Sequence, residues 1–191
     1  IIGNGLYISR QSGNFNITTS VGELLNVLTD EVTDVANLPS LCKHGYVVKV
    51  ANSEAEEDDY YVKFKGKLKT GGTEGVDTDY LDGAGVWEEC PKPGVKTTFD
   101  DTKMPHQLAR IDANTFEISK PTWITRPVGD TVTVPEPSFI GKPINNLLFY
   151  MNRLVMLSDE NVIMSQPGEF FNFWPKSAIT YTATDVIDLS V

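Results

Sequence analysis

RLVMLSDENVIMS, residues 153–165, is the stretch that decides the fold of the C-terminal third. Val155 and Leu157 alternate with other side chains before the polar residues Asp159-Glu160-Asn161, and a second apolar run follows at 162–164. Two short apolar runs on either side of a polar turn are typical of a β-hairpin. The sequence therefore predicts paired strands here.

Upstream of this hairpin, residues 144–155 fit two kinds of structure. Part of the pattern matches one stripe of a helix, formed by Ile144, Leu147, Leu148, Met151, Leu154 and Val155. The run is nevertheless short and aromatic, and it leads directly into the alternating pattern. We therefore favour a strand, with one helical turn at its start as the open alternative.

Downstream of the hairpin lies an aromatic segment, Phe170-Phe171-Asn172-Phe173-Trp174. Strand alternation places Phe171 and Phe173 on one face and Phe170 on the other, so both faces need cover from a layered core or a subunit interface. Arg153 stands among apolar residues and is expected to pair with a carboxylate, cap backbone carbonyls or face a neighbouring subunit. The candidates for structural or assembly roles are Arg153, Leu154, Phe170, Phe171, Phe173 and Trp174.

Working towards the N-terminus, the stretch 127–143 is rich in proline and predicts an extended linker. Residues 107–110 and 115–119 flank Asp112-Ala113-Asn114 and predict a hairpin, and 86–88 predicts a short strand after a loop rich in Gly and Asp. Regular short strands with Gly and Pro turns are typical of a β-sandwich, barrel or propeller.

The first half of the chain adds strands and a small helical element. Alternating residues predict strands at 46–50 and 60–64 and a hairpin within 1–19. Ser20-Val21-Gly22-Glu23 has the pattern of a capping box and predicts one short helix after it, and residues 32–38 have roughly helical spacing before Pro39.

Composition narrows the function classes. The 191-residue chain carries a net charge of −10, which disfavours gripping nucleic acid through phosphate contacts. An acidic wall can still surround DNA and let it slide, although most of these acids are expected only to confer solubility. Cys42 and Cys90 are too few for a disulfide scaffold, and no apolar run approaches the length of a membrane helix.

The motifs that usually carry catalysis or metal binding are weak here. Carboxylates in the acidic run 54–59 point in different directions, which favours a solvated turn over a cation site. The segment Asp77–Gly83 resembles a calcium loop, but Leu81 and Asp82 stand where the loop needs an oxygen ligand and a glycine. The two histidines, His44 and His106, fit no catalytic spacing. We expect no cofactor, no metal and no active site.

Several motifs resemble the nozzle protein family of short-tailed bacteriophages, also called tail tubular protein B. They occur in the family's order and cover most of residues 20–190. The matching segments are DVANLP at 34–39, HGYVVKVAN at 44–52, DDYYVKF at 58–64, GVWEE at 85–89, MPHQLAR at 104–110, NRL at 152–154, LSDENVIMS at 157–165 and GEFFNF at 168–173.

The resemblance implies an internal fragment of a longer virion protein. It implies a mainly β fold in which an α+β insertion joins propeller-like β-structure. The implied domains are the hairpin end of a preceding β-domain at 1–19, a β-rich insertion domain with one short helix at 20–126, the Pro-rich linker at 127–143, and a propeller-like hairpin with an aromatic plug at 144–191.

In function, the resemblance implies a structural, non-enzymatic part of the virion tail, made and assembled in the host cytoplasm. Its implied partners are further copies in a six-fold ring, the tail adaptor protein, the tail fibres, and genomic DNA that passes through without sequence-specific binding; membrane insertion is not implied. Two alternatives stay open: a tail-associated hydrolase of peptidoglycan or capsule polysaccharide, which needs two converging carboxylates, and a non-catalytic carbohydrate-binding β-module.

Overall fold

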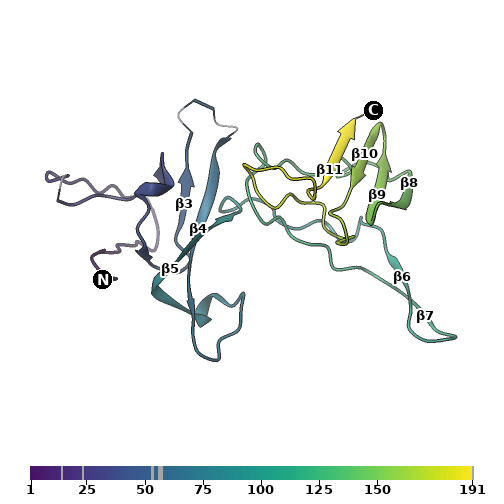
Figure 1. Cartoon of the computed structure of the whole chain (residues 1–191), viewed down its shortest axis with the longest axis horizontal. Coiled ribbons are helices and arrows are strands. Elements are labelled where there is room, and N and C mark those ends of the chain that lie inside the picture. Colours follow the sequence, from purple (N-terminus) through teal and green to yellow (C-terminus); the bar gives the residue numbers. More distant parts are fainter. Residues whose placement is uncertain (14, 23, 53, 56–57, 191) are drawn as a thin grey trace. The chain divides into compact units, whose positions relative to one another are not determined.

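A computed structural model describes residues 1–13, 15–22, 24–52, 54–55 and 58–190. The chain forms two compact units, Ile1–Pro93 and Gly94–Val191 (Figure 1). In the described residues both units are built from strands and irregular chain, and the helical elements are single 3-10 turns, η1 (Val35–Asn37) and η3 (Asp77–Asp79). The prediction of a mainly β chain with a minor helical element is thus confirmed.

Unit 1 contains a five-stranded sheet in the order β1-β3-β4-β5-β2. Its strands are β1 (Glu31–Val32), β2 (Leu41–Cys42), β3 (Val47–Val50), β4 (Tyr60–Leu68) and β5 (Tyr80–Cys90). The alternation predicted at 46–50 and 60–64 is confirmed, because β3 pairs antiparallel with β4 and buries Val48, Val50 and Val62. Trp87 covers this core, and its indole N–H donates to the carbonyl of Pro39 at 2.9 Å.

Strand β5 is much longer than the predicted strand at 86–88. Of the glycines that suggested a loop, Gly83 and Gly85 belong to the strand, and Gly85 lies opposite Gly66 of β4; Gly71, Gly72 and Gly75 do lie between β4 and η3. A Cβ on Gly85 would lie 2.2 Å from the Lys65 carbonyl oxygen, and one on Gly66 would lie 1.9 Å from that of Leu81. Glycine is therefore required here because two backbones approach closely. Composition alone does not distinguish such strand glycines from the glycines of a loop.

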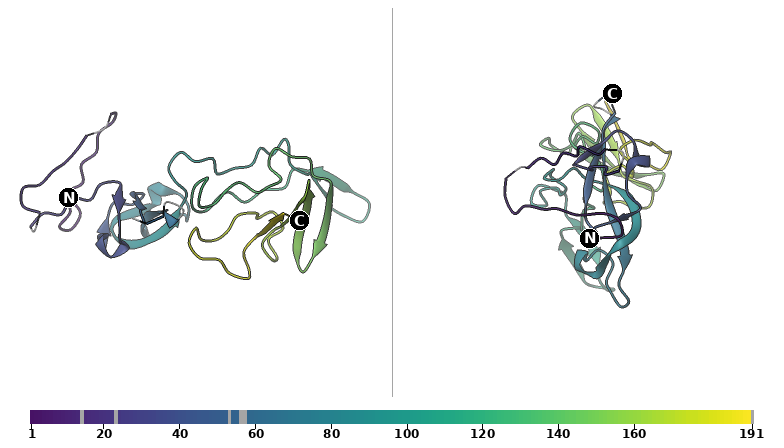
Figure 2. Two further views of the ribbon diagram at one scale, coloured as in Figure 1. Left: turned by 90° about the horizontal axis from the view of Figure 1, so that it is seen from above. Right: turned by 90° about the vertical axis from the view of Figure 1, so that its left-hand side faces the viewer.

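The segment before β1 departs from the predictions. The short helix expected after Ser20 is wrong for the described residues, because only one turn forms, in which Leu24 and Leu25 donate to the carbonyl of Val21. Leu24 and Leu25 are exposed, so these two residues contribute no buried apolar contact that would stabilise a helix, whereas Leu28 packs on the core of the sheet outside any helix. Glu23 of the capping box lies outside the described residues. The described part of 1–19 runs as irregular chain with one isolated bridge, Ile2 to Gly5 (Figure 2).

Unit 2 contains two sheets. The larger has the order β11-β10-β9-β8 and is antiparallel throughout, with β8 (Asn146–Tyr150), β9 (Arg153–Ser158), β10 (Asn161–Met164) and β11 (Ile187–Ser190). The smaller is the hairpin of β6 (Gln107–Arg110) and β7 (Phe116–Ser119). Both predicted hairpins are confirmed, and the ambiguous stretch 144–155 is strand. Its tight turn at Met151-Asn152, with both residues at positive φ, was not predicted.

The Pro-rich stretch 127–143 contains no strand or helix, and turns at 131–133 and 138–141 interrupt it. Val128, Val134 and Phe139 are buried, and they pack within unit 2. The boundary between the two units falls at Pro93 and Gly94, whereas the sequence prediction began the linker at 127. The division into four named segments stays a prediction.

The close pairing of β4 and β5 generates the first prediction. Replacing Gly85 with Ala forces the two backbones apart, and we expect the free energy of unfolding to fall by about 1–3 kcal/mol. Urea unfolding of the variant chain measures this loss. Gly22→Ala is the matched control, since a Cβ there meets nothing within 4 Å. Equal stability of the two variants would contradict the backbone contact.

Candidate functional site

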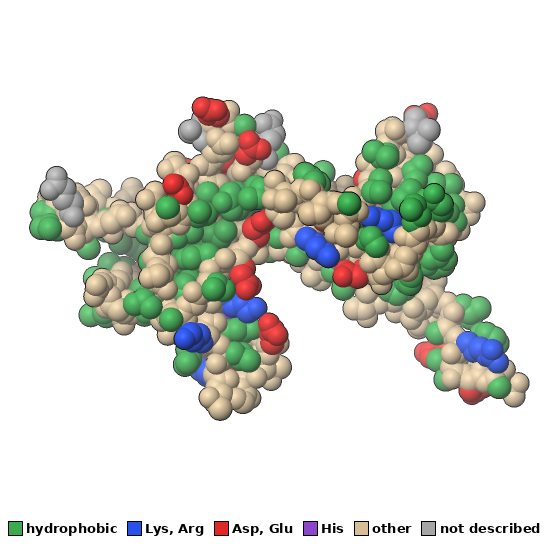
Figure 3. Space-filling view, viewed as in Figure 1, with side chains coloured by type: hydrophobic (Ala, Val, Ile, Leu, Met, Phe, Trp, Pro, Cys, Tyr) green, Lys and Arg blue, Asp and Glu red, His purple; other side chains and the backbone are tan. Residues whose placement is uncertain are grey.

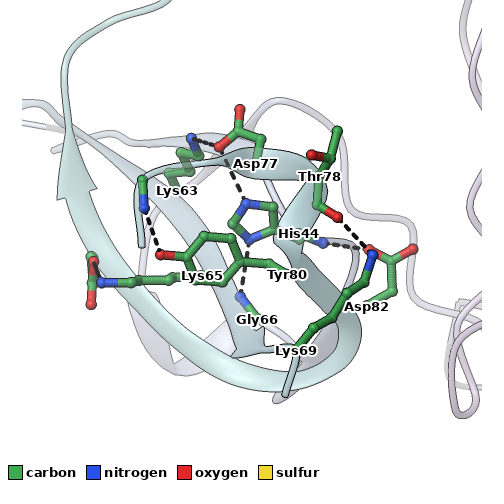
Figure 4. Close-up of polar contacts among 11 residues, drawn as sticks. His44, Lys63, Lys65, Gly66, Lys69, Asp77, Thr78, Tyr80 and Asp82 are labelled. Atoms are coloured by element: carbon green, nitrogen blue, oxygen red, sulfur yellow. Dashed lines mark hydrogen bonds and ion pairs between the residues drawn. The ribbon is translucent and has the colours of Figure 1, made fainter. Parts of the chain in front are cut away.

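The polar pocket of unit 1 lies on one side of the pair β4 and β5 (Figure 4). It has a volume of about 350 Å³ and is lined by His44, Lys63, Lys65, Glu74, Gly75, Asp77, Tyr80, Glu88, Glu89 and Cys90. Alternation brings Lys63 and Lys65 to one face of β4, while the chain between β4 and β5 carries Glu74 and, at the start of η3, Asp77 to the same side. Several titratable groups therefore converge in this pocket.

His44 is held on both sides of its ring. Its Nδ1 accepts the backbone N–H of Gly66 at 3.1 Å, so in the neutral ring the proton sits on Nε2, which lies 3.3 Å from Oδ1 of Asp77. The ring also stacks on Tyr80 with the centroids 4.3 Å apart. These contacts hold the His44 ring against Gly66 of β4 and Tyr80 of β5, so His44 has a structural role.

The charged groups around His44 are paired with one another. Lys63 contacts Asp77 at 3.1 Å, and the hydrogen bonds from Lys63 and His44 hold the pKa of the Asp77 carboxyl below its usual value. Lys65 contacts Glu74 at 3.1 Å and Glu88 at 3.6 Å. Such surface pairs contribute little to stability each, but they occupy the groups that an acid or base catalyst must keep available.

Cys90 lines the pocket, but its thiol is not activated as a nucleophile. Burial raises the pKa of its thiol to about 11, so little thiolate is present at neutral pH. Cys42 is likewise buried, and burial raises the pKa of its thiol. The pocket therefore joins strands through ion pairs and offers no activated nucleophile among the residues that the structure describes.

The two acidic motifs have structural explanations. Asp59 is the last residue of the acidic run and is buried. It contacts Lys49 Nζ at 2.6 Å and accepts a hydrogen bond from the Asn52 N–H at 2.7 Å. In the calcium-like segment, Asp79 accepts the N–H of Thr73 at 2.9 Å. The described ranges contain no group of three or more His, Cys, Asp or Glu that could hold a metal ion. Glu56 and Glu57 lie outside these ranges.

The aromatic segment 170–174 forms the centre of unit 2. It is a turn and irregular chain, so strand alternation does not apply, yet Phe171 and Phe173 both contact Trp123 as expected of one side. Trp174 stacks on Phe99 with the centroids 5.0 Å apart. Phe170 lies apart from this group and packs edge-on against Phe149 of β8 at 5.2 Å.

Arg153 caps backbone carbonyls, one of its three expected roles. Its guanidinium is buried and donates to the carbonyls of Ser165 at 2.6 Å, Asp185 at 2.7 Å and Ala183 at 3.0 Å. Leu154 beside it is 7% exposed. Of the six sequence-predicted candidates, Phe173 and Trp174 are buried too, so the structure gathers four of them inside unit 2 and leaves Phe170 and Phe171 half-buried.

Two exposed apolar surfaces were missed by the sequence reasoning. One is strand β8 with its turn, where Phe149 is 70% and Met151 74% exposed. The other is the β6–β7 hairpin, where Leu108 is 66% and Ile118 74% exposed. Figure 3 shows apolar side chains gathered over both regions. The available signal was the uninterrupted apolar run 147–151, which is longer than a strand with one solvated face requires.

Comparison with known proteins identifies the family. The family model described as bacteriophage nozzle protein matches residues 2–191. The chain belongs to the bacteriophage nozzle protein family. It is 32% identical over 197 residues to tail tubular protein gp12 of Escherichia phage T7, an alignment that covers 100% of the chain. The same alignment covers 23% of the relative, so the chain spans about a quarter of that protein's length.

Membership makes this nozzle chain a segment of a structural protein of the virion tail. The ion-paired pocket and the carbonyl-capping arginine agree with a structural role, since each joins chain segments to one another. In the described part of the nozzle chain, no helix has the length and apolar character that spanning a membrane requires.

The contacts of Arg153 generate the second prediction. Arg153→Met keeps the aliphatic volume but leaves two buried carbonyls and one partly buried carbonyl without this donor, and we expect the free energy of unfolding to fall by about 3 kcal/mol. Thermal unfolding measures the change. Lys120→Met, which removes a cation from an exposed ion pair with Asp101, is the control and is expected to cost less than about 1 kcal/mol. If Arg153→Met were as stable as the parent chain, the capping role would be refuted.

The third prediction concerns Asp185, which is buried. Burial raises the pKa of its carboxyl, but the backbone N–H groups of Thr182 and Lys176 and the Thr182 hydroxyl outweigh burial, so this pKa lies below its usual value. The ionised carboxylate therefore stabilises the fold above about pH 4, and this contribution is lost as the pH falls through the lowered pKa.

Asp185→Asn is accordingly expected to be less stable than the parent chain at pH 7 and to lose less stability between about pH 5 and pH 2. Denaturant unfolding at a series of pH values shows both effects. Asp101→Asn, at an exposed ion pair, is the matched control. Parallel pH profiles for the parent chain and Asp185→Asn would contradict the assignment.

Proposed function

We propose that this chain is part of the wall of a tail nozzle, in which copies of the full-length protein form a ring around the DNA exit channel and present docking surfaces to the tail fibres and the adaptor protein. The observation that carries the proposal is the match of residues 2–191 to the nozzle family. The ring, its six-fold symmetry, the channel and the partners are parts of the proposal. So is the propeller, for which the four-stranded antiparallel sheet of unit 2 is a suitable blade.

The charge of the chain supports a channel that does not hold its DNA. With 16 basic and 26 acidic residues, the chain repels phosphates overall. Many of its cations are also engaged in ion pairs, such as Lys63 with Asp77 and Lys142 with Asp159, so they are not free to contact phosphates. DNA can then move past such a wall without sequence-specific binding or strong retention.

The proposed role is non-enzymatic. A glycan hydrolase needs two carboxylates facing one sugar bond. In the pocket of unit 1, Glu74 and Glu88 both contact Lys65, and Asp77 contacts Lys63, so these carboxylates are bound to lysines. The exposed aromatic residues Phe149 and Tyr150 of β8 would also suit a carbohydrate-binding module, but the match to the nozzle family favours the tail component over this module and over the hydrolase.

The fourth prediction tests the conduit. The full-length protein is expected to have the mass of a multi-chain ring in light scattering, alone or with its adaptor protein, and to leave linear duplex DNA unshifted in an electrophoretic assay at moderate salt. A basic DNA-binding protein in the same assay is the positive control. A single-chain mass even with the adaptor present would overturn the proposal, and so would tight DNA binding.

A further inference from the structure

The β6–β7 hairpin of unit 2 has one apolar face that is left exposed by the residues that the structure describes. The register pairs Leu108 with Ile118 and Arg110 with Phe116, so these four side chains share one face of the two-stranded ribbon. Leu108, Phe116 and Ile118 are all exposed, and the ribbon projects from the rest of unit 2 (Figures 1 and 2). An isolated two-stranded ribbon is marginally stable in water, so this face is suited to a partner.

Strand β8 is a second uncovered surface on the same unit. It lies at the edge of its sheet, with β9 on one side and no described strand on the other, although the Leu147 N–H donates to Oδ1 of Asn146 at 2.8 Å. All five of its residues are exposed, and its run of Leu147, Leu148, Phe149 and Tyr150 is apolar on both faces. The exposed side chains of β8 therefore offer an apolar surface against which a partner's apolar face can pack.

We propose that the apolar face of the β6–β7 ribbon in one copy docks on the β8 edge of a second copy. The two surfaces match in kind and in length, with four residues in each ribbon strand and five in β8. Contact between two different surfaces of identical chains is head-to-tail, and head-to-tail contacts generate a ring when the rotation closes. The inference therefore rests on the proposed nozzle function and names the surfaces that form it.

The charge pattern favours a second copy as the occupant. Two chains that each carry a net charge of −10 repel each other, so a contact between them is most favourable between surfaces that lack acidic residues. The stretch 145–152, which contains β8, has no charged residue, and the only charged side chain on the apolar ribbon face is the cation Arg110. Arg110 also donates to the carbonyls of Asp112 and Ala113 at the tip, which holds its charge on the ribbon.

The first test introduces charged residues on the two sides of the proposed contact and is made with the full-length protein. Ile118→Glu and Tyr150→Glu each place an acid in one of the two surfaces, and we expect each to raise the concentration needed for assembly at least tenfold. Both positions are exposed, so the chain is expected to fold normally, which circular dichroism verifies. Ile118→Glu combined with Tyr150→Lys brings opposite charges together and is expected to restore assembly. Leu81→Glu, at an exposed apolar residue of unit 1, is the matched control.

Crosslinking identifies the occupant. Full-length chains carrying Leu108→Cys are mixed with differently tagged chains carrying Tyr150→Cys and treated with a short bis-maleimide. A crosslink between the two tags, missing from mixtures without the introduced cysteines, is expected and places the ribbon on β8 of another copy. When both cysteines are put in one chain, a crosslink that stays within that chain would overturn the proposal in favour of a contact inside one copy.

The two proposals fail differently. If the unmodified full-length protein does not assemble, the nozzle ring fails and the ribbon contact fails with it. If the unmodified protein forms a ring but Ile118→Glu and Tyr150→Glu assemble as readily as Leu81→Glu, the ring stands and the contact proposed here is refuted.

Discussion

Unit 2 depends on two buried arginines that bind backbone carbonyls. Much of this unit is irregular chain, whose buried carbonyls lack the partners that a strand or helix supplies. Arg153 donates to the carbonyls of Ser165, Ala183 and Asp185, which ties β9 to the chain that precedes β11. Arg126 does the same for the stretch predicted as a linker, since it donates to the carbonyls of Lys96, Asp130 and Val134.

Backbone carbonyls are the hydrogen-bond acceptors of both buried guanidinium groups, and the carboxylates of Asp130 and Glu136 add electrostatic attraction at Arg126. Arg126 lies over the Trp174 ring at 4.4 Å, so the face of an aromatic ring and carbonyl oxygens together replace the hydration of its charge. Burial nevertheless lowers the pKa of the guanidinium, which shows the cost of removing it from water. The aromatic cluster around Trp174 is therefore both the apolar core and part of the environment that keeps Arg126 in place.

The sequence predicts this fold where the cause is local. Alternation located β3, β4 and the hairpin of β9 and β10, because each has a clear apolar face and a polar turn. Alternation failed where a contact distant in the sequence determines the local structure. Gly85, for example, lies in a strand because another backbone passes close to it. Asp59 looked like a solvated acid because its partner Lys49 lies in a neighbouring strand. The carbonyls bound by Arg153 up to 32 residues away carry no sequence signal at all.

The division between interior and surface follows from the same contacts. Because the arginines and the aromatic cluster satisfy the centre of unit 2, Leu108, Ile118 and Met151 are not needed to fold it, and they remain in water. Exposed apolar side chains carry a risk of aggregation that a monomeric protein has reason to avoid. In the docking proposed above, identical copies cover these side chains in a defined order. That proposal would account for an apolar surface that the folding of the single chain does not require.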